Sequence, residues 1–266
     1  MIPIGPSLKA SITPDKMIDF PAADAVEAEL ANIEPLAVLF GHGCSAAAHS
    51  LHGLIAPAFE AAGLDLRRDP FGTGDNVQVA MQRLQIHGLI FHATPKSVAS
   101  QPCAVELRTA ADLAAPIFTL RDQIEVPEQL RDRIFLELSE PGAINENDTL
   151  YLASAMRMRA RVHWVWQWLR ESSRSVMERE GGVNWLLQQS PQILAEFFNP
   201  LAGLHQLEDE DPTVSALLAG LLERTGMRSE AKQCLGQWWH AVRHPLSRQT
   251  ITDIFAVWGA PQPKES

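Results

Sequence analysis

GLIFHATPKSVASQPCAVELRTAADL, residues 88–113, holds a short apolar run, a polar loop and a helical pattern in close succession. The run at 88–93 predicts a strand that is buried on both faces. Glu106 lies about 60° from Cys103 on a helical wheel, at the edge of an apolar stripe. A carboxylate there suits a catalytic acid, although it also suits a glutamate that reaches solvent. The helix is expected over 100–113, and its stripe is made by Cys103, Leu107, Ala110, Ala111 and Ala114.

The same alternation of strand and helix continues on both sides of this stretch. Strands alternating with helices of about 10–15 residues predict a doubly wound parallel sheet, here over residues 35–140. The ligand crevice of such a sheet lies at the carboxyl ends of its strands, so the loops after Phe40, Arg68 and Ala93 should meet there. The other strands are expected at 36–40, 64–67, 116–120 and 133–138, and the other helices at 22–33, 45–62 and 77–85.

The two ends of the chain differ from this central part. Residues 1–34 are expected to form an irregular arm followed by one helix, and residues 141–266 an all-helical domain that holds all seven tryptophans. Within it, residues 212–245 resemble a single tetratricopeptide unit, which we interpret as a helical hairpin because one repeat cannot bury its own face. The helices are expected at 149–172, 183–189, 192–198, 214–225, 229–240 and 248–257.

Net charge, hydropathy and cysteine spacing exclude several classes of protein. The net charge of −10 argues against binding to nucleic acid or to an anionic membrane surface. The sequence shows neither an apolar run of about 18 residues nor the pattern of a signal peptide. Its three cysteines lack the CxxC spacing, so neither a disulfide framework nor a structural zinc site is expected. These features predict a cytoplasmic protein without a membrane partner.

One histidine-rich segment of the sequence holds several residues of the types that bind metal ions. His42, Cys44, His49 and His52 are close in sequence, and His49 and His52 share a helix face. They lack the regular spacing of C-x-x-C or H-E-x-x-H motifs, so we interpret them as core or surface histidines and expect no metal.

The order of elements between residues 35 and 139 resembles that of a Toll/interleukin-1 receptor (TIR) domain, most closely a bacterial one. Asp69–Asp75 resembles the BB loop of that family, and 93–102 resembles its approach to the third helix, with Pro102 in place of tryptophan. Cys103, Glu106 and Leu107 match its C-x-x-E-L motif. The resemblance implies a flavodoxin-like fold of the central domain, followed by the all-α domain.

The resemblance also implies a site. In catalytically active TIR domains the motif glutamate is essential for NAD+ glycohydrolysis, which points to Glu106 as the catalytic residue, with NAD+ as substrate and no cofactor. Gly41, His42 and Gly43 would approach the phosphates and ribose, since glycines let backbone N–H groups come close to a ligand. In the BB loop, Asp69 and Phe71 are the expected binding residues, Phe71 covering or stacking on the base.

The implied function is hydrolysis of NAD+ to nicotinamide plus ADP-ribose or cyclic ADP-ribose, in a bacterial immune or antiphage effector that is activated by assembly. Self-association through the TIR-like domain, and a protein partner or ligand at the helical domain, are the expected interactions. The alternative is a non-catalytic TIR-like interaction scaffold. A third hypothesis is a nucleoside-processing enzyme of similar topology, such as a deoxyribosyltransferase.

Overall fold

The chain divides into two compact units in a computed structural model. One unit is Leu30–Gln167, and the other combines Met1–Glu29 with Trp168–Ser266. The structure describes residues 21–42, 46–68, 84–122, 134–138, 140–169, 175–190 and 245–257, with single positions at 81, 124, 193, 232, 236, 239, 240, 259 and 261.

The first unit is built on a five-stranded sheet in which all neighbouring strands are parallel. Its strand order is β2-β1-β3-β4-β5, which is the order of flavodoxin-like folds. The predicted parallel α/β sheet is therefore confirmed. The order reverses between β1 and β3, and this reversal is the switch point at which such folds bind ligands. The strands are β1 (Leu36–Gly41), β2 (Leu64–Arg68), β3 (Leu89–Ala93), β4 (Ile117–Arg121) and β5 (Ile134–Glu137).

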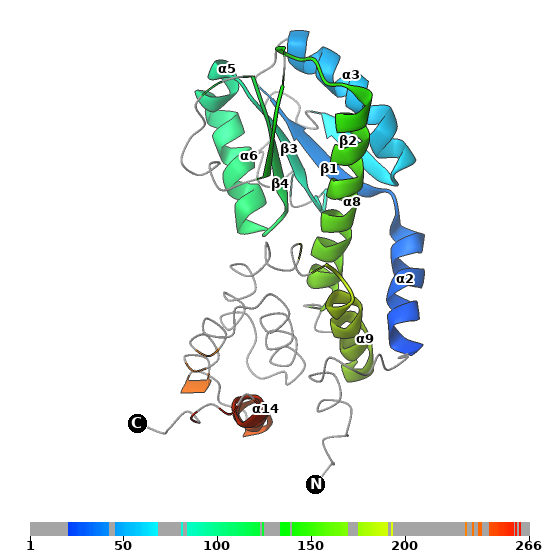
Figure 1. Cartoon of the computed structure of the whole chain (residues 1–266), viewed down its shortest axis with the longest axis vertical. Helices are drawn as coiled ribbons and strands as arrows, with labels where there is room; N and C mark the ends of the chain where they lie inside the picture. The colour runs from blue at the N-terminus through cyan, green and yellow to red at the C-terminus, as the bar shows by residue number, and fades with distance from the viewer. Residues whose placement is uncertain are drawn as a thin grey trace. The chain divides into compact units, whose positions relative to one another are not determined.

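Helices cover both faces of the sheet. Figure 1 shows α3 (Ala46–Ala61) and α8 (Glu146–Leu169) on one side and α6 (Gln101–Asp112) on the other. Successive side chains of a strand point to opposite faces, so each strand contributes to two cores. The core on the α3 and α8 face includes Phe40, Ile90, Leu120, Leu51, Phe59, Leu152 and Met156, and that on the α6 face includes Leu39, Leu89, Phe91, Ile117, Cys103 and Ala110.

The connection from β3 to α6 contains a short helix that the sequence did not predict. This helix is α5 (Pro95–Val98), within a segment expected to be loop. Thr94 caps it through a capping box with Ser97, in which each side chain accepts from the other residue's backbone N–H. The proline at its first turn and this box stabilise a helix that is too short for the periodicity of its apolar residues to reveal.

The buried face of helix α6 differs from the predicted apolar stripe. Its buried side chains are Cys103, Glu106, Thr109 and Ala110, whereas Ala111 is exposed. The expectation that Ala111 faces the core is therefore wrong, and so is the interpretation of Glu106 as a glutamate that reaches solvent. Three of these four buried side chains are small, and the carboxylate of the fourth, Glu106, lies beside Gly41.

The remaining described helices are α2 (Pro21–Ile33), α9 (Val176–Leu187) and α14 (Pro245–Val257), with α8 joining the two units. Helix α9 begins seven residues before its predicted start at 183, because Ser175 and Glu178 form a capping box. None of the described helices is both long and apolar enough to cross a membrane. The expected helices at 77–85, 192–198, 214–225 and 229–240, the arm at 1–20 and the hairpin at 212–245 lie wholly or mostly outside the described residues.

Candidate functional site

The carboxylate of Glu106 lies against the end of β1. A Cβ atom added to Gly41 would lie 2.7 Å from Glu106 Oε2, and 3.3 Å from side-chain carbons of both Leu89 and Phe91. Any larger residue at position 41 would therefore displace the carboxylate. Glu106 is 8% exposed, which is low for a glutamate. Gly41 and Glu106, which the resemblance places in one site, are thus in direct proximity at the switch point.

A second contact joins α6 to the segment after β1. The thiol of Cys103 donates to the backbone carbonyl of His42 over 3.4 Å. Cys103 and Glu106 are one helical turn apart, so they approach neighbouring residues of the β1 end. The C-x-x-E part of the motif therefore contacts both described members of the predicted Gly41–His42–Gly43 loop.

The side chain of His42 is buried among aromatic rings. Its ring centroid lies 5.4 Å from that of Phe40 and 5.6 Å from that of His49. Both distances are within the range of favourable ring pairs. His42 is 8% exposed, so it belongs to the carboxyl edge of the sheet and not to the outer surface.

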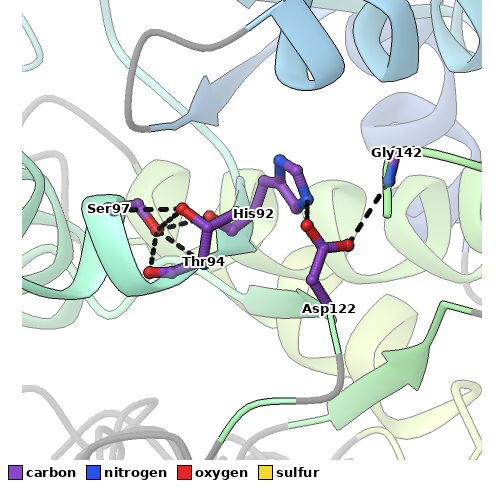
Figure 2. Close-up of polar contacts among 5 residues, drawn as sticks. All are labelled: His92, Thr94, Ser97, Asp122 and Gly142. Carbon is purple, nitrogen blue, oxygen red and sulfur yellow. Dashed lines mark hydrogen bonds and ion pairs between the residues drawn. The ribbon is translucent and has the colours of Figure 1, made fainter. Parts of the chain in front are cut away.

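The sequence analysis missed a buried histidine–aspartate pair at the same edge. Figure 2 shows the ring of His92, in β3, directed at the carboxylate of Asp122, which follows β4. His92 Nε2 lies 3.0 Å from Asp122 Oδ2, and the His92 side chain is fully buried. The backbone N–H of Gly142 reaches the other carboxylate oxygen over 3.4 Å.

The backbone of His92 is fixed by the cap of α5. The hydroxyl of Ser97 donates to the His92 carbonyl over 2.7 Å, and it accepts from the Thr94 backbone N–H over 2.8 Å. Ser97 is 1% exposed, so water does not compete for these contacts. Hydrogen bonds of Ser97 and Thr94 therefore join the end of β3 to the first turn of α5 (Figure 2).

A positively charged side chain also lies at this edge of the sheet. Arg121 is the last residue of β4, and its guanidinium carbon lies 3.5 Å from the centroid of the Phe135 ring. Among the residues that the structure describes, Arg121 Nε has no hydrogen-bond partner. Strand alternation places this side chain on the α6 face, the same face as Glu106.

The structure therefore brings Gly41, His42 and Glu106 together. The other predicted binding residues, Gly43, Asp69 and Phe71, lie outside the described residues, as does Cys44 of the histidine-rich segment. Over the described part of the chain, no group of three or more His, Cys, Asp or Glu side chains is arranged to hold a metal ion. His52 instead contacts the backbone carbonyl of Leu66 through Nε2, at 3.2 Å.

A second histidine pair lies at the opposite, amino-terminal end of the sheet. His87 Nδ1 and His163 Nδ1 are 3.3 Å apart, and His163 Nε2 donates to the Leu113 carbonyl over 2.8 Å. Because Nε2 of His163 carries the proton, its Nδ1 accepts from His87. Burial, and secondarily the nearby His163, lower the pKa of His87 to about 3. His87 is therefore neutral at physiological pH, and the pair is a structural contact.

The arrangement at the carboxyl edge can supply a buried carboxylate, a histidine oriented by a second carboxylate, and a guanidinium group. No family model, curated protein or solved structure matches this chain.

Proposed function

We propose that this chain is an NAD+ glycohydrolase of the TIR type, with Glu106 as its catalytic residue. The observation that carries the proposal is the position of the Glu106 carboxylate, which is buried against Gly41 at the β1–β3 switch point. Ligands of flavodoxin-like sheets bind at this point. The proposed products are nicotinamide and ADP-ribose or its cyclic form.

The chemistry needs a negative charge near the ribose. Cleavage of the nicotinamide–ribose bond develops positive charge on the sugar, as in glycoside hydrolysis, and a nearby carboxylate stabilises that charge. Water is largely excluded around Glu106, so its charge is screened less than it would be on the surface. The nicotinamide is already a good leaving group, so the reaction needs no general acid on its side.

The neighbouring residues have subsidiary roles in the proposal. Gly41 leaves space for the carboxylate and for close approach of the ligand to the backbone. Arg121 is suited to a phosphate of the diphosphate, because its guanidinium has donors to offer at the same edge. The resemblance to TIR proteins further supports assembly of several copies, a role in antiphage defence and a partner at the helical domain as parts of the proposal.

The test is NAD+ consumption by the purified full-length chain at high protein concentration. Nicotinamide release is measured for the wild type, for Glu106→Gln and for Glu60→Gln, a glutamate exposed on α3. We expect turnover that falls at least about 100-fold in Glu106→Gln and is unchanged in Glu60→Gln, since loss of one positioned charge-stabilising group costs about 10²–10³-fold. Turnover that survives Glu106→Gln would refute the assignment, and a wild type without turnover at any concentration would favour the interaction scaffold.

A further inference from the structure

The His92–Asp122 pair has a hydrogen-bonding capacity that the fold does not use. Asp122 accepts a hydrogen bond through Oδ2, so His92 Nε2 carries the proton. In the neutral ring this leaves Nδ1 as an acceptor. Nδ1 is buried, and it has no hydrogen-bond partner within the described part of the chain. A buried acceptor without a donor is costly, and such groups in a folded protein need an explanation.

The location of His92 connects this acceptor to the switch point. In the β1–β3 register Gly41 pairs with Phe91, so His42 and His92 follow at equivalent positions on the two strands that flank the reversal. The Phe40 ring is stacked on the His92 ring at a centroid distance of 6.5 Å, and it is tilted by 41° against the His42 ring at 5.4 Å. The acceptor therefore belongs to the same edge as Gly41 and Glu106, on the opposite face of the sheet.

The chemistry of the pair selects the kind of group it can bind. A phosphate at neutral pH presents mainly acceptors, and it would meet the negative charge of Asp122 at 3.0 Å from the ring. A neutral hydroxyl donates one hydrogen bond and brings no charge, which matches Nδ1. The Gly142 N–H and Ser97 hold Asp122 and the His92 backbone, so the acceptor is oriented before a ligand arrives.

We propose that His92 and Asp122 form a hydroxyl-binding site at the switch point, in which His92 Nδ1 accepts a hydrogen bond from a sugar hydroxyl of the dinucleotide. The inference rests on the proposed function for the identity of the ligand. His92 is a substrate-binding residue in this account, and Asp122 is a positioning residue that fixes the tautomer of the ring.

The direct test is nitrogen NMR of the full-length chain labelled with ¹⁵N-histidine, with ADP-ribose as the probe because hydrolysis cannot consume it. In the free protein we expect His92 as the Nε2–H tautomer, and Asp122→Asn should abolish this preference. Added ADP-ribose should shift the Nδ1 resonance of His92. His163 is a matched internal control, since the Leu113 carbonyl fixes the same tautomer at the opposite end of the sheet.

A second test separates binding from structure by kinetics. The amide of His92→Gln can still donate to Asp122 but offers no acceptor at the Nδ1 position. We expect KM for NAD+ to rise about tenfold with kcat nearly unchanged, since the lost hydrogen bond belongs to ground state and transition state alike. His92→Asn places an amide oxygen near the Nδ1 position and should restore part of the affinity. Circular dichroism checks that both variants fold.

The outcomes distinguish the two proposals. If ADP-ribose shifts other resonances and wild-type turnover is present while His92 Nδ1 stays unchanged, the hydroxyl-binding site is refuted and the glycohydrolase proposal stands. If ADP-ribose causes no shift anywhere and NAD+ is not consumed, both proposals fail. An Nδ1–H tautomer in the free protein would also overturn the assignment of the acceptor.

Discussion

Replacing His87 by asparagine should remove a specific dependence of stability on pH. The pKa of His87 is lowered to about 3 in the folded chain, from 6.5 in the unfolded chain. Between these values the unfolded state binds one more proton than the folded state. The contribution of neutral, buried His87 to the free energy of unfolding is therefore complete above pH 6.5, and it is lost progressively as the pH falls toward 3. From pH 7.5 to pH 5.0 this linkage removes about 2 kcal/mol from the free energy of unfolding.

The assay is urea unfolding followed by circular dichroism at pH 7.5 and pH 5.0, for the wild type and for His87→Asn. An asparagine amide can still donate toward His163 Nδ1, whose contact with His87 spans 3.3 Å, and asparagine does not titrate. All other groups titrate in both proteins, so the difference between them isolates His87. If the two units unfold in separate steps, the step that the substitution moves belongs to the unit of the sheet, Leu30–Gln167.

We expect the midpoint of the wild type to fall about 1 M further in urea than that of the variant over this pH interval, for a slope of about 2 kcal/mol/M. Equal shifts for the two proteins would mean that His87 titrates alike in the folded and unfolded chains. The inference that burial keeps His87 neutral in the His87–His163 pair would then be wrong.

Three further predictions concern the edge and the core of the sheet. Gly41→Ala should destabilise the wild-type protein by about 1–3 kcal/mol, because the new Cβ would lie 2.7 Å from the Glu106 carboxylate. In a Glu106→Ala background the same substitution should cost much less. Equal costs in urea unfolding would contradict the proximity of Gly41 and Glu106. Ser97→Ala should cost about 1–3 kcal/mol by the same assay, because it removes the buried hydroxyl that donates a hydrogen bond to the His92 carbonyl. Thr94→Ser keeps the helix cap and should cost less than about 1 kcal/mol. Gly88→Ala places a Cβ 2.5 Å from Met156 Sδ and should cost about 1–3 kcal/mol, and a double-mutant cycle with Met156→Ala should show coupling; additive costs would argue against that contact.

Local patterns predicted the sheet well because four of its five strands are short, mainly apolar runs, and only the edge strand β2, LDLRR, alternates apolar and charged residues. β1, β3 and β4 are covered on both faces, so their sequences are almost continuously apolar. Gly63 follows the end of α3, and its φ of +74° is the left-handed conformation that glycine adopts at a helix end. These features depend on a few consecutive residues, which is why the sequence is sufficient for them.

The pairing of His92 with Asp122 could not be predicted in the same way. The two residues are 30 positions apart, and their contact depends on the register of β3 against β4. His92 sits within an apolar run, where it raised no separate signal. A polar residue near the carboxyl end of a buried strand, followed by an aspartate after the next strand, is the pattern that would have found the pair.

The burial of Glu106 also required the structure. The helical wheel places it at the edge of a stripe, and a small rotation of the helix decides whether such a residue faces solvent or core. Here Glu106 faces the core because Gly41 has no side chain, and the carboxylate occupies the space that a Cβ would take.

Helix α8 has a practical consequence for anyone who wishes to study the sheet by itself. A fragment that stops at residue 140, where the strands have ended, would omit four side chains that line its hydrophobic core: Leu152, Ala153, Met156 and Ala160. Losing the burial of Leu152 and Met156 alone would remove about 3–6 kcal/mol, a large part of the stability of an ordinary domain. Such a fragment would be prone to aggregate, and its inactivity would say nothing about Glu106. A truncation that extends to Gln167 keeps this layer intact.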